Sequence, residues 1–403
     1  MYGEMGFGLK VMVLGADGYI GWPLSLHLLA LGHEVIGVDN FSRRRRVREV
    51  GARSAISLGN PYERYGRVKD LYPGKFDWRV NDLLDGEEID YLFKYYKPDA
   101  VVHLAEQPSA PYSHIDRDHA VETQINNTIG TVNVLFAMKN HAPNCHLIKL
   151  GTMGEYGTPN IDIGEGYLTV EHRGRKDTLP FPKQAGSWYH QTKVFDSHNI
   201  RFACKIWGLR STDIMQGVLY GVVTDEMLLE GSADYDQTLM TRFDFDEYFG
   251  TALNRFMAQA VIGFPLTVYG KGYQKRGYLA LRDAIQCLTI ALEKPPEEGK
   301  YRVWNQFDEC YTVLELADKV KQVGKEFGLD VTIHNISNPR VEAEEHYYNP
   351  DRQHLPDHGF KPTYTLEDEL RIMFPILIKN RRRIEERKDR ILPTHDYRRT
   401  SQT

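Results

Sequence analysis

Short apolar runs alternate with longer amphipathic stretches over the first half of the chain. Short runs bounded by turn residues are typical of strands, and apolar positions three and four apart are typical of helices. Strands are expected over residues 10–14, 34–39, 76–82, 100–105, 146–150 and 211–216, and helices over residues 22–31, 85–96, 119–139 and 189–207. Strands that alternate with helices favour an α/β fold with a doubly wound parallel sheet.

A glycine-rich turn lies between the first expected strand and the first expected helix. Gly15, Gly18 and Gly21 form a G-x-x-G-x-x-G motif, and Asp39 ends the second strand. Such glycines let the backbone approach a pyrophosphate at the helix N-terminus, while the carboxylate accepts from ribose hydroxyls. The arrangement predicts dinucleotide binding in a Rossmann-type domain; the alternative is a glycine-rich turn without a ligand.

The choice between NAD and NADP depends on two features of opposite effect. Four consecutive arginines, residues 43–46, follow the second strand and are able to hold a 2′-phosphate. Asp39 repels such a phosphate and favours NAD. We expect NAD, with the arginines in a solvated loop and Arg43 near the adenine.

The pattern becomes less regular after residue 217. Residues 223–249 are acidic and rich in turn formers, and charges dominate from residue 381 onward, as in a solvated helix with a frayed end. Between them a helix is expected over residues 251–262, a strand over 265–269 and a basic loop over 270–278. The sequence predicts an NAD-binding domain over residues 1–217, to which later segments such as 251–291 return, and a smaller substrate-binding lobe with a polar tail over residues 218–403.

Tyr189 and Lys193 carry the candidate chemistry. Four residues apart on a helix, they share one face, and an ammonium beside a phenol lowers the pKa of the phenol. Such a phenol takes a proton from a sugar hydroxyl while hydride leaves the same carbon. Thr152, at the end of the fifth strand, is placed to share that proton through its hydroxyl. A Y-x-x-x-K pair also fits a surface tyrosine with a solvated lysine, so the upstream glycine motif is what favours catalysis.

Composition narrows the class of protein and its setting. The 403-residue chain is 41% hydrophobic and 26% charged, as globular proteins are, and its formal charge of −5 argues against a nucleic-acid partner. Four scattered cysteines (Cys145, Cys204, Cys287 and Cys310) indicate a reducing compartment and no metal site. No apolar run spans a bilayer, and the first strand begins near Lys10, which leaves no room for a targeting peptide. We expect a cytoplasmic enzyme without a membrane partner.

These motifs resemble the extended short-chain dehydrogenase/reductase group, which contains the nucleotide-sugar epimerases and dehydratases. Within that group the chain is most similar to the UDP-sulfoquinovose synthase family. The similarity runs over residues 10–350 and is densest over residues 106–107, 109–113, 149–162, 249–256 and 338–349. The resemblance implies a homodimeric NAD enzyme of sulfolipid or glycan biosynthesis. It would join UDP-glucose and sulfite, or a sulfite donor, through 4-keto and 4-keto-5-ene intermediates.

The resemblance also implies roles for residues near the tyrosine. In the 4,6-dehydratases the catalytic threonine precedes an Asp-Glu pair, whereas Thr152 precedes Met-Gly at residues 153–154. A thioether cannot give a proton, so Glu155 or a second role of Tyr189 is expected at C5 and C6. His190 is expected to place sulfite as a partly protonated donor, the alternative being a helix-face histidine without a role.

The implied binding residues extend over most of the chain. Expected cofactor contacts, besides Tyr189 and Lys193, are Gly15, Asp17, Gly18, Tyr19, Ile20, Gly21, Asp39, Asn40, Arg43, Asp82, Leu83, Leu104, Ala105, Glu106, Asn126, Gln216 and Val218. Expected UDP-sugar contacts are Gln107, Thr152, Gln216, Arg242, Tyr269, Gln274, Arg276, Arg340 and Glu345. A diphosphate needs two or more cations, which arginines supply. Pro108 stands where plant-type members carry arginine, which changes the expected contact with an anion.

Two other functions stay open from the sequence. A UDP-sugar 4-epimerase or 4,6-dehydratase would use the same scaffold, although the Met-Gly pair after Thr152 argues against the dehydratase. A non-catalytic NAD(H)-binding scaffold or sensor would not need Thr152, Tyr189 and Lys193 together.

Overall fold

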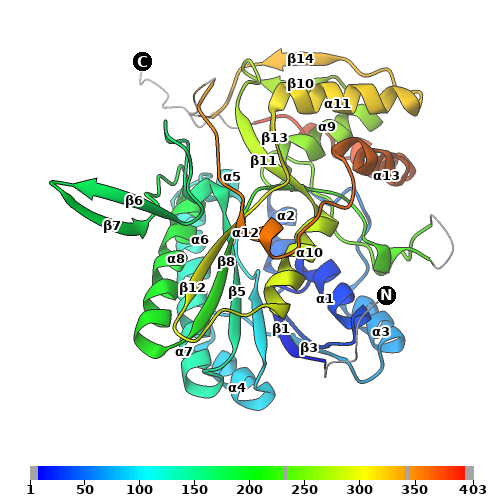
Figure 1. Cartoon of the computed structure of the whole chain (residues 1–403). Helices are drawn as coiled ribbons and strands as arrows, with labels where there is room; N and C mark the ends of the chain where they lie inside the picture. Colours follow the sequence, from blue (N-terminus) through cyan, green and yellow to red (C-terminus); the bar gives the residue numbers. More distant parts are fainter. Residues whose placement is uncertain (1–7, 230–233, 341–342, 344, 395–403) are drawn as a thin grey trace.

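The chain folds into a parallel sheet covered by helices, with a second lobe in the upper half of Figure 1. The computed structural model describes residues 8–229, 234–340, 343 and 345–394. Residues 341, 342 and 344 of a block singled out in the sequence, and the end of the polar tail, lie outside the described residues. No helix of the described part has the length and apolar character that crossing a membrane requires.

Seven parallel strands form the main sheet in the order β12-β8-β5-β4-β1-β2-β3. Their bounds are Lys10–Leu14 (β1), Glu34–Asp39 (β2), Phe76–Val80 (β3), Ala100–His103 (β4), His146–Thr152 (β5), Arg210–Gln216 (β8) and Tyr301–Gln306 (β12). The strand order runs outward in opposite directions from β1 and β4, which opens a crevice at their carboxyl ends. The predicted doubly wound parallel sheet is confirmed.

A separate helical layer covers each face of this sheet. The helices of this part are Gly21–Ala30 (α1), Ser42–Glu49 (α2), Pro61–Leu71 (α3), Gly86–Tyr96 (α4), Ala110–Ser113 (α5), Arg117–Gln124 (α6), Gly130–His141 (α7), Trp188–Trp207 (α8) and Leu281–Glu293 (α10). Successive side chains of a strand point to opposite faces. Val11 and Val13 of β1 therefore pack in the cluster that contains α1 and α10, whereas Met12 and Leu14 pack with α4, α7 and α8.

The second lobe is built from short segments that lie far apart in the sequence. It contains a three-stranded sheet of Val218–Tyr220 (β9), Lys275–Ala280 (β11) and Glu309–Thr312 (β13), and a parallel pair of Leu266–Tyr269 (β10) and Ile333–Ile336 (β14). The later helices are Ala252–Val261 (α9), Val313–Glu326 (α11), His354–Asp357 (α12), Leu366–Lys379 (α13) and Arg381–Glu385 (α14). α9 packs against α11 and α13, which gives the lobe its own helical layer.

Several elements differ from those expected. A π-helix, Ile125–Ile129, interrupts the helix expected over residues 119–139. A hairpin of Tyr167–His172 (β6) and Arg175–Pro180 (β7) projects from the body (Figure 1). β12 follows residue 217 in the chain and completes the main sheet. Of the segment 251–291, α10 packs on β5, whereas α9 and β10 lie in the second lobe. The division of the chain at residue 217 stays a prediction.

Candidate active site

A cavity of about 470 Å³ lies where the carboxyl ends of β1, β2, β4, β5 and β8 meet the second lobe. Most residues that the sequence predicts to bind the cofactor or substrate, or to act in catalysis, line this cavity: Gly15, Gly18, Tyr19, Ile20, Gly21, Asp39, Asn40, Arg43, Asp82, Leu83, Leu104, Ala105, Glu106, Asn126, Thr152, Tyr189, His190, Lys193, Gln216, Val218, Tyr269, Gln274, Arg276 and Arg340. Asp17, Gln107, Glu155, Arg242 and Glu345 lie outside its lining. The fold thus brings the glycine turn, the start of α8 and the basic residues of the second lobe together.

The turn after β1 keeps space free that side chains would fill. Gly15 has a φ of +86°, and a Cβ on it would stand 2.8 Å from the carbonyl carbon of Leu104. A Cβ on Gly21 would clash with the carbonyl oxygen of Gly15. α1 begins at this turn without a side-chain cap, the Trp22 N–H donates to the Gly18 carbonyl at 3.3 Å, and the N–H groups of Tyr19, Ile20 and Gly21 are the ones that stay available for a diphosphate. The turn fits a dinucleotide such as NAD.

Asp39 lies on the cavity wall at the end of β2. Its carboxylate accepts from the backbone N–H groups of Asp17 (2.8 Å) and Phe41 (2.7 Å). Burial, together with the charge of Asp17, raises the pKa of Asp39 to about 6. Asp17 itself is 4% exposed, and its carboxylate pairs with Arg44 and Arg64. Asp17 therefore stabilises the turn from behind instead of contacting a cofactor directly.

The arginine run 43–46 is bound to carboxylates and is not a free basic loop. Arg43 pairs with Asp244 at 2.7 Å, and Arg44 pairs with Asp17 at 2.6 Å. Of the four arginines, Arg43 alone belongs to the cavity lining. A 2′-phosphate would have to compete with these carboxylates for the arginines, so the structure favours NAD over NADP.

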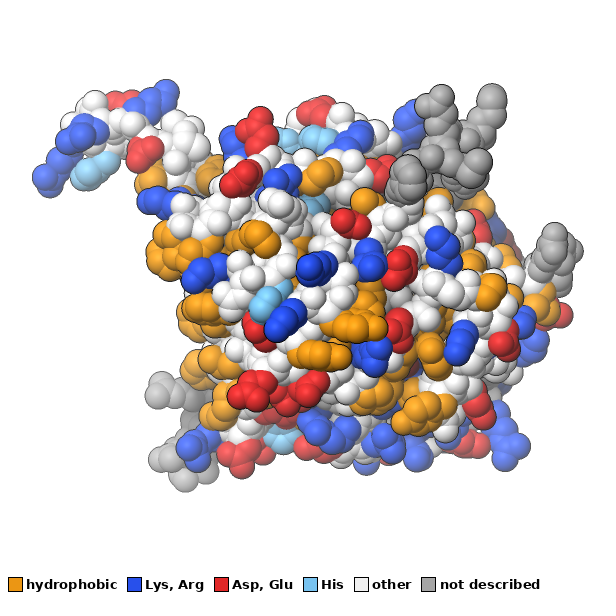
Figure 2. Space-filling view, turned by 90° about the horizontal axis from the view of Figure 1, so that it is seen from below, with side chains coloured by type: hydrophobic (Ala, Val, Ile, Leu, Met, Phe, Trp, Pro, Cys, Tyr) orange, Lys and Arg blue, Asp and Glu red, His pale blue; other side chains and the backbone are white. Residues whose placement is uncertain are grey.

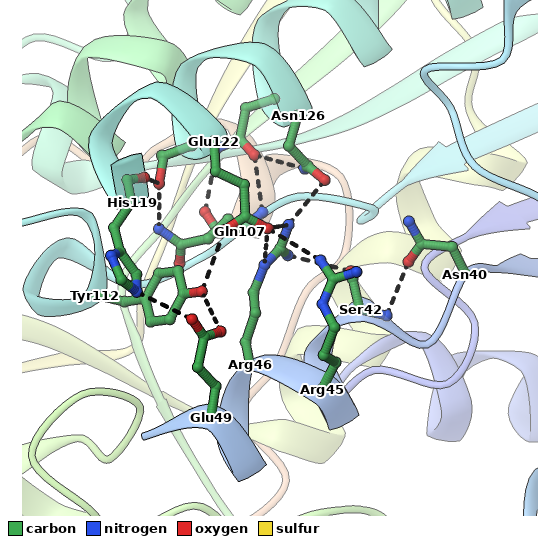
Figure 3. Close-up of polar contacts among 12 residues, drawn as sticks. Asn40, Ser42, Arg45, Arg46, Glu49, Gln107, Tyr112, His119, Glu122 and Asn126 are labelled. Carbon is green, nitrogen blue, oxygen red and sulfur yellow. Dashed lines mark hydrogen bonds and ion pairs between the residues drawn. The ribbon is translucent and has the colours of Figure 1, made fainter. Parts of the chain in front are cut away.

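The other two arginines close a network beside the cavity (Figure 3). Arg45 and Arg46 bind Glu122 at 3.2 and 2.9 Å. Arg46 also donates to Asn126 Oδ1 at 3.0 Å, and Asn126 lies on the π-helix and lines the cavity. π-Bulges inside α-helices are frequent at functional sites. Here the bulge and Arg46 together fix the orientation of Asn126.

Gln107 is buried behind the cavity wall. Its backbone N–H donates to Asn127 Oδ1 (2.8 Å), and its side-chain amide donates to Thr123 and to the carbonyl of Ser109 (both 2.9 Å). Asn127 also donates to Thr192 on α8 at 2.9 Å. Gln107 thus ties the loop after β4 to α6 and α8, and it is not placed to contact a sugar.

Tyr189 and Lys193 lie on the first turns of α8 and line the cavity with Thr152. The Lys193 ammonium lies 5.8 Å from the centre of the Tyr189 ring, pairs with Glu106 and donates to the Leu150 carbonyl at 2.6 Å. Burial, and then the charge of Glu106, raises the pKa of Tyr189 above its ordinary value. The expectation that Lys193 makes this phenol acidic is therefore wrong for the protein alone, because burial and the charge of Glu106 raise the pKa.

Glu155, expected as an acid or base, is enclosed behind Thr152. It is 0% exposed, and its carboxylate accepts from the Thr152 N–H (3.2 Å) and the Ser197 hydroxyl (2.9 Å). It also pairs with Lys183. The Thr152 hydroxyl accepts in turn from the Gly154 N–H at 3.1 Å, which completes a capping box. These bonds give Glu155 a role in positioning Thr152, away from the cavity.

The imidazole of His190 lies directly beside Gly154 on the cavity wall. A Cβ on Gly154 would stand 2.5 Å from His190 Cδ2, and the Ser187 hydroxyl holds Nδ1 at 2.9 Å. Burial, with the nearby charges of Arg276 and Lys193, lowers the pKa of His190 to about 3. The expectation of a partly protonated ring is therefore wrong for the free protein, because these neighbours favour the neutral imidazole.

The second lobe brings basic side chains to the opposite wall. Arg276 and Arg340 line it together with Tyr269 and Gln274. Arg255, which was not singled out in the sequence, joins them from α9. Arg255 is 5% exposed, and its guanidinium lies 4.1 Å above the centre of the Tyr269 ring. The wall therefore carries three arginines, one of which lies over the ring of Tyr269.

α9 also presents its N-terminus to this cavity. Thr251 accepts from the Asn254 N–H at 3.2 Å, and Thr251, Ala252 and Arg255 belong to the lining. A helix N-terminus favours anions, so the position suits a diphosphate. The sequence signal was a capping threonine one turn ahead of an arginine.

Two residues expected to bind substrate lie apart from this wall. Arg242 is 3% exposed and pairs with Asp244 at 2.8 Å. Glu345 is exposed and lies outside the lining. Neither is placed to contact a ligand in the cavity.

The relatives of this chain are nucleotide-sugar enzymes. Residues 11–222 match the NAD dependent epimerase/dehydratase family. The UDP-sulfoquinovose synthase of Sulfolobus acidocaldarius is 48% identical over 391 residues, which cover 97% of this chain and 98% of the relative. The chloroplastic UDP-sulfoquinovose synthase of Spinacia oleracea is 52% identical over 361 residues, which cover 90% of this chain and 73% of the relative.

Solved structures share the fold. The UDP-glucose 4-epimerase of Thermotoga maritima with UDP-glucose has a TM-score of 0.68 at 18% identity and covers 92% of this chain and 99% of its own. The UDP-glucuronic acid 4-epimerase of Bacillus cereus with UDP-glucuronic acid and NAD has a TM-score of 0.68 at 21% identity and the same coverage. The chain belongs to the NAD dependent epimerase/dehydratase family. Within that family it belongs to the UDP-sulfoquinovose synthases.

Proposed function

We propose that this chain converts UDP-glucose and sulfite into UDP-sulfoquinovose and water, with NAD recycled within the site. The observation that carries the proposal is that the Tyr189–Lys193 pair and His190 meet in one cavity. It is supported by 48% identity to a named synthase over 97% of the chain. No net oxidation results, because the hydride removed from C4 of the sugar returns to C4.

The first step oxidises C4 of the glucose ring. NAD, which the glycine turn and Asp39 would hold, would supply the hydride acceptor for C4 and a positive charge that favours the phenolate. Tyr189 takes the proton of the C4 hydroxyl, and the Thr152 hydroxyl shares that hydrogen bond. Lys193, held by Glu106 and the Leu150 carbonyl, keeps its ammonium beside the phenol. The resulting C4 ketone makes the hydrogen on C5 acidic.

His190 is assigned to proton transfer at C5 and C6. Glu155 is enclosed, whereas the His190 imidazole lines the cavity. Arg276 and Arg340 are among the groups that lower the pKa of His190, and a bound diphosphate would balance their charges and raise that pKa. His190 takes the C5 proton and gives it to the departing C6 hydroxyl, which leaves as water. Hydrogen sulfite then adds through sulfur to C6 of the enone, and the proton that it releases reaches C5 through His190.

The second lobe is assigned to the UDP group. Arg255, Arg276 and Arg340 supply the cations that a diphosphate needs, and the N-terminus of α9 lies on the same wall. Tyr269, on that wall, is assigned to the uracil. Pro108 also lines the cavity, and it brings no charge to the sulfite.

A second copy of the chain is the expected partner. Large apolar side chains stay exposed along the outer face of α6, the π-helix, α7 and α8: Val121, Ile125, Ile129, Phe136, Phe195, Phe202 and Ile206, each 43–60% exposed. Figure 2 shows hydrophobic side chains along the edge on the side where α7 and α8 lie in Figure 1. An apolar stripe of this extent marks an interaction surface. We assign it to a homodimer that packs these helices across a two-fold axis.

A cytoplasmic setting is part of the same proposal. Cys145, Cys204, Cys287 and Cys310 are all free, and the first three are buried. Free buried thiols fit a reducing compartment.

One incubation tests the activity against its alternatives. Purified protein, UDP-glucose and sulfite are combined, and the sugar nucleotides are identified by mass and by nuclear magnetic resonance. A sulfonated sugar nucleotide supports the proposal. A 4-keto-6-deoxy sugar or a C4 epimer would instead indicate a dehydratase or an epimerase, and an unchanged substrate with retained NAD would indicate a binding protein.

A further inference from the structure

A buried lysine with no part in the steps above lies behind the catalytic helix. Lys149 sits in the middle of β5, with a side chain only 1% exposed. Sheet register places it between His103 on β4 and Asp213 on β8. A charged side chain at such a position is costly unless it is paired, so its partners define its role.

Lys149 shares one carboxylate with the catalytic lysine. Its ammonium pairs with Oε1 of Glu106 and lies 3.3 Å from Asp196 Oδ2. Oε2 of Glu106 pairs with Lys193, which also donates to the Leu150 carbonyl. The two lysines and two acids have side chains 0–6% exposed. One buried carboxylate therefore bridges two ammonium groups, one structural and one beside Tyr189.

We propose that Lys149 is a positioning residue for the reaction, whose ammonium balances Glu106 so that Glu106 holds Lys193 beside Tyr189 without leaving excess negative charge there. The proposal rests on the proposed function, because it assigns Lys149 to the acid–base step at C4. Glu106 is the link: it touches both lysines and lines the cavity.

The charges around Tyr189 act in opposite directions. Glu106, Glu155 and Asp196 raise the pKa of the phenol, and Lys149 lowers it. Burial raises the pKa of Asp196 well above its ordinary range, and the charges of Lys149 and Lys193 lower it. Glu106 is the acid that pairs with both lysines, whereas Asp196 lies 3.3 Å from Lys149.

The remaining ionisable neighbours are His103, Asp213 and Glu155, and Oδ1 of Asp213 accepts no hydrogen bond from the described residues. His103 lies 3.9 Å from Glu106, and burial lowers the pKa of His103 to about 3, so its ring is neutral. Asp213, across from Lys149 on β8, accepts from the hydroxyls of Ser197 (2.7 Å) and Tyr301 (2.5 Å). The charge of Glu155 is met by Lys183. Lys149 and Lys193 therefore pair with different oxygens of Glu106, Oε1 and Oε2.

Removal of Lys149 is expected to shift proton transfer and not merely to loosen the fold. In Lys149→Met the charge of Glu106 stays unbalanced beside Tyr189. The pH midpoint for reduction of bound NAD by UDP-glucose, measured in single turnovers, should rise by about one unit, or about tenfold in rate at fixed pH on the rising limb. Lys149→Arg keeps the charge and should keep the midpoint near that of the wild type. An unchanged midpoint in folded Lys149→Met, with only a lower melting temperature, would overturn the proposal.

Two further variants keep the test decisive if Lys149→Met does not fold. Glu106→Gln removes the negative charge and leaves Lys149 in place, so the pH midpoint should fall. The midpoint of the double variant, Glu106→Gln with Lys149→Met, should lie between the midpoints of the two single variants. A midpoint that rises or stays fixed in Glu106→Gln contradicts the charge balance. His146→Gln, on the same buried strand, is the control, because it perturbs β5 without touching Glu106 and should leave the midpoint unchanged.

A second readout needs no substrate. The onset of tyrosinate absorbance with pH is compared between each variant and the same variant carrying Tyr189→Phe. The onset should move to lower pH in Glu106→Gln and to higher pH in Lys149→Met. This measurement separates the two proposals, because it reports the charge balance even in a protein that makes no sulfonated sugar.

Discussion

The imidazole of His190 occupies the space that a side chain on Gly154 would fill. A Cβ at residue 154 would stand 2.5 Å from His190 Cδ2, well inside van der Waals contact. The neighbouring glutamate, Glu155, is turned away into bonds with Thr152, Ser197 and Lys183. His190 can occupy this position only because residue 154 is a glycine. The glycine at residue 154 and the histidine at residue 190 therefore depend on each other.

Gly154→Ala is expected to displace His190 while C4 oxidation continues. The methyl group has no room beside the ring, and misplacement of a catalytic group costs on the order of 100-fold in rate. Sulfonated product should fall by that factor, while reduction of bound NAD by UDP-glucose persists. Gly186→Ala, two residues before α8 and with nothing within 4 Å of the added Cβ, is the matched control. Wild-type product formation in Gly154→Ala would remove His190 from the reaction.

Tyr189→Phe is expected to leave the cofactor bound and to abolish turnover. Loss of a general base costs on the order of 10²–10⁴ in rate. Burial and Glu106 raise the pKa of Tyr189, so the reactive phenolate grows with pH and the wild-type rate of C4 oxidation should rise toward alkaline pH. Single-turnover reduction of bound NAD, followed over pH, measures both effects. A flat profile, or activity in the variant, would assign the base role elsewhere.

Asp39→Ala is expected to weaken NAD binding by roughly 10–100-fold, the usual worth of hydrogen bonds to a charged group. The variant also leaves the N–H groups of Asp17 and Phe41 without their acceptor. Asp39→Asn is the control, because it keeps an acceptor oxygen without the charge. Titration calorimetry with NAD and NADP measures the change, and equal affinity of Asp39→Ala and the wild type would count against the ribose contact.

NAD binding is also expected to depend on acidity. The pKa of Asp39 is raised to about 6, so the carboxyl takes up a proton as the pH falls through that value. The ionised form accepts better from ribose hydroxyls, so NAD affinity should fall below about pH 6. The pH dependence should flatten in Asp39→Asn; an equal dependence in both proteins would place the titrating group elsewhere.

Phe202→Asp with Ile129→Asp is expected to give a monomer. The two side chains are 60% and 47% exposed on neighbouring helices, and a buried unpaired carboxylate opposes association. Tyr95→Asp, 63% exposed on α4, is the control with equal exposure away from that face. Light scattering after gel filtration gives the mass. A monomeric wild type would show that the apolar stripe has another occupant.

Most of the main sheet could be read from the sequence because its strands are short segments bounded by turn residues, and β1 and β4 are nearly continuous apolar runs. The first five strands lie where periodicity placed them, and the glycine motif and Asp39 meet at one cavity as expected. β12 could not be found in the same way, because Tyr301–Gln306 is half polar and joins the sheet only after a long excursion through the second lobe. The local pattern of apolar and polar residues does not show which distant strand a segment pairs with.

The site residues divide in a similar way. Tyr189 and Lys193 are linked by helical spacing alone, so the sequence was enough to pair them. Glu155 looked like an acid because it follows Thr152 closely, yet its partners Ser197 and Lys183 come from other segments and enclose it. A carboxylate's accessibility depends on such distant neighbours, which no local motif records.

The same holds for charges that the sequence left unexplained. The four consecutive arginines looked like a basic loop, and the fold pairs them with three acids from other segments, Asp17, Glu122 and Asp244. Lys149 stood inside an apolar run without an assigned role, because its partner Glu106 follows a different strand. Charge balance in the interior is a property of the folded chain.

Retention of the C4 hydrogen is the sharpest test of a hydride that leaves C4 and returns to it. UDP-glucose deuterated at C4 is turned over with sulfite, and the product is examined by mass and nuclear magnetic resonance. We expect a sulfonated sugar nucleotide that keeps its deuterium at C4 and carries a solvent hydrogen at C5. Loss of the C4 deuterium to solvent, or a C5 hydrogen that never exchanges, would contradict a hydride that is taken up and returned within this cavity.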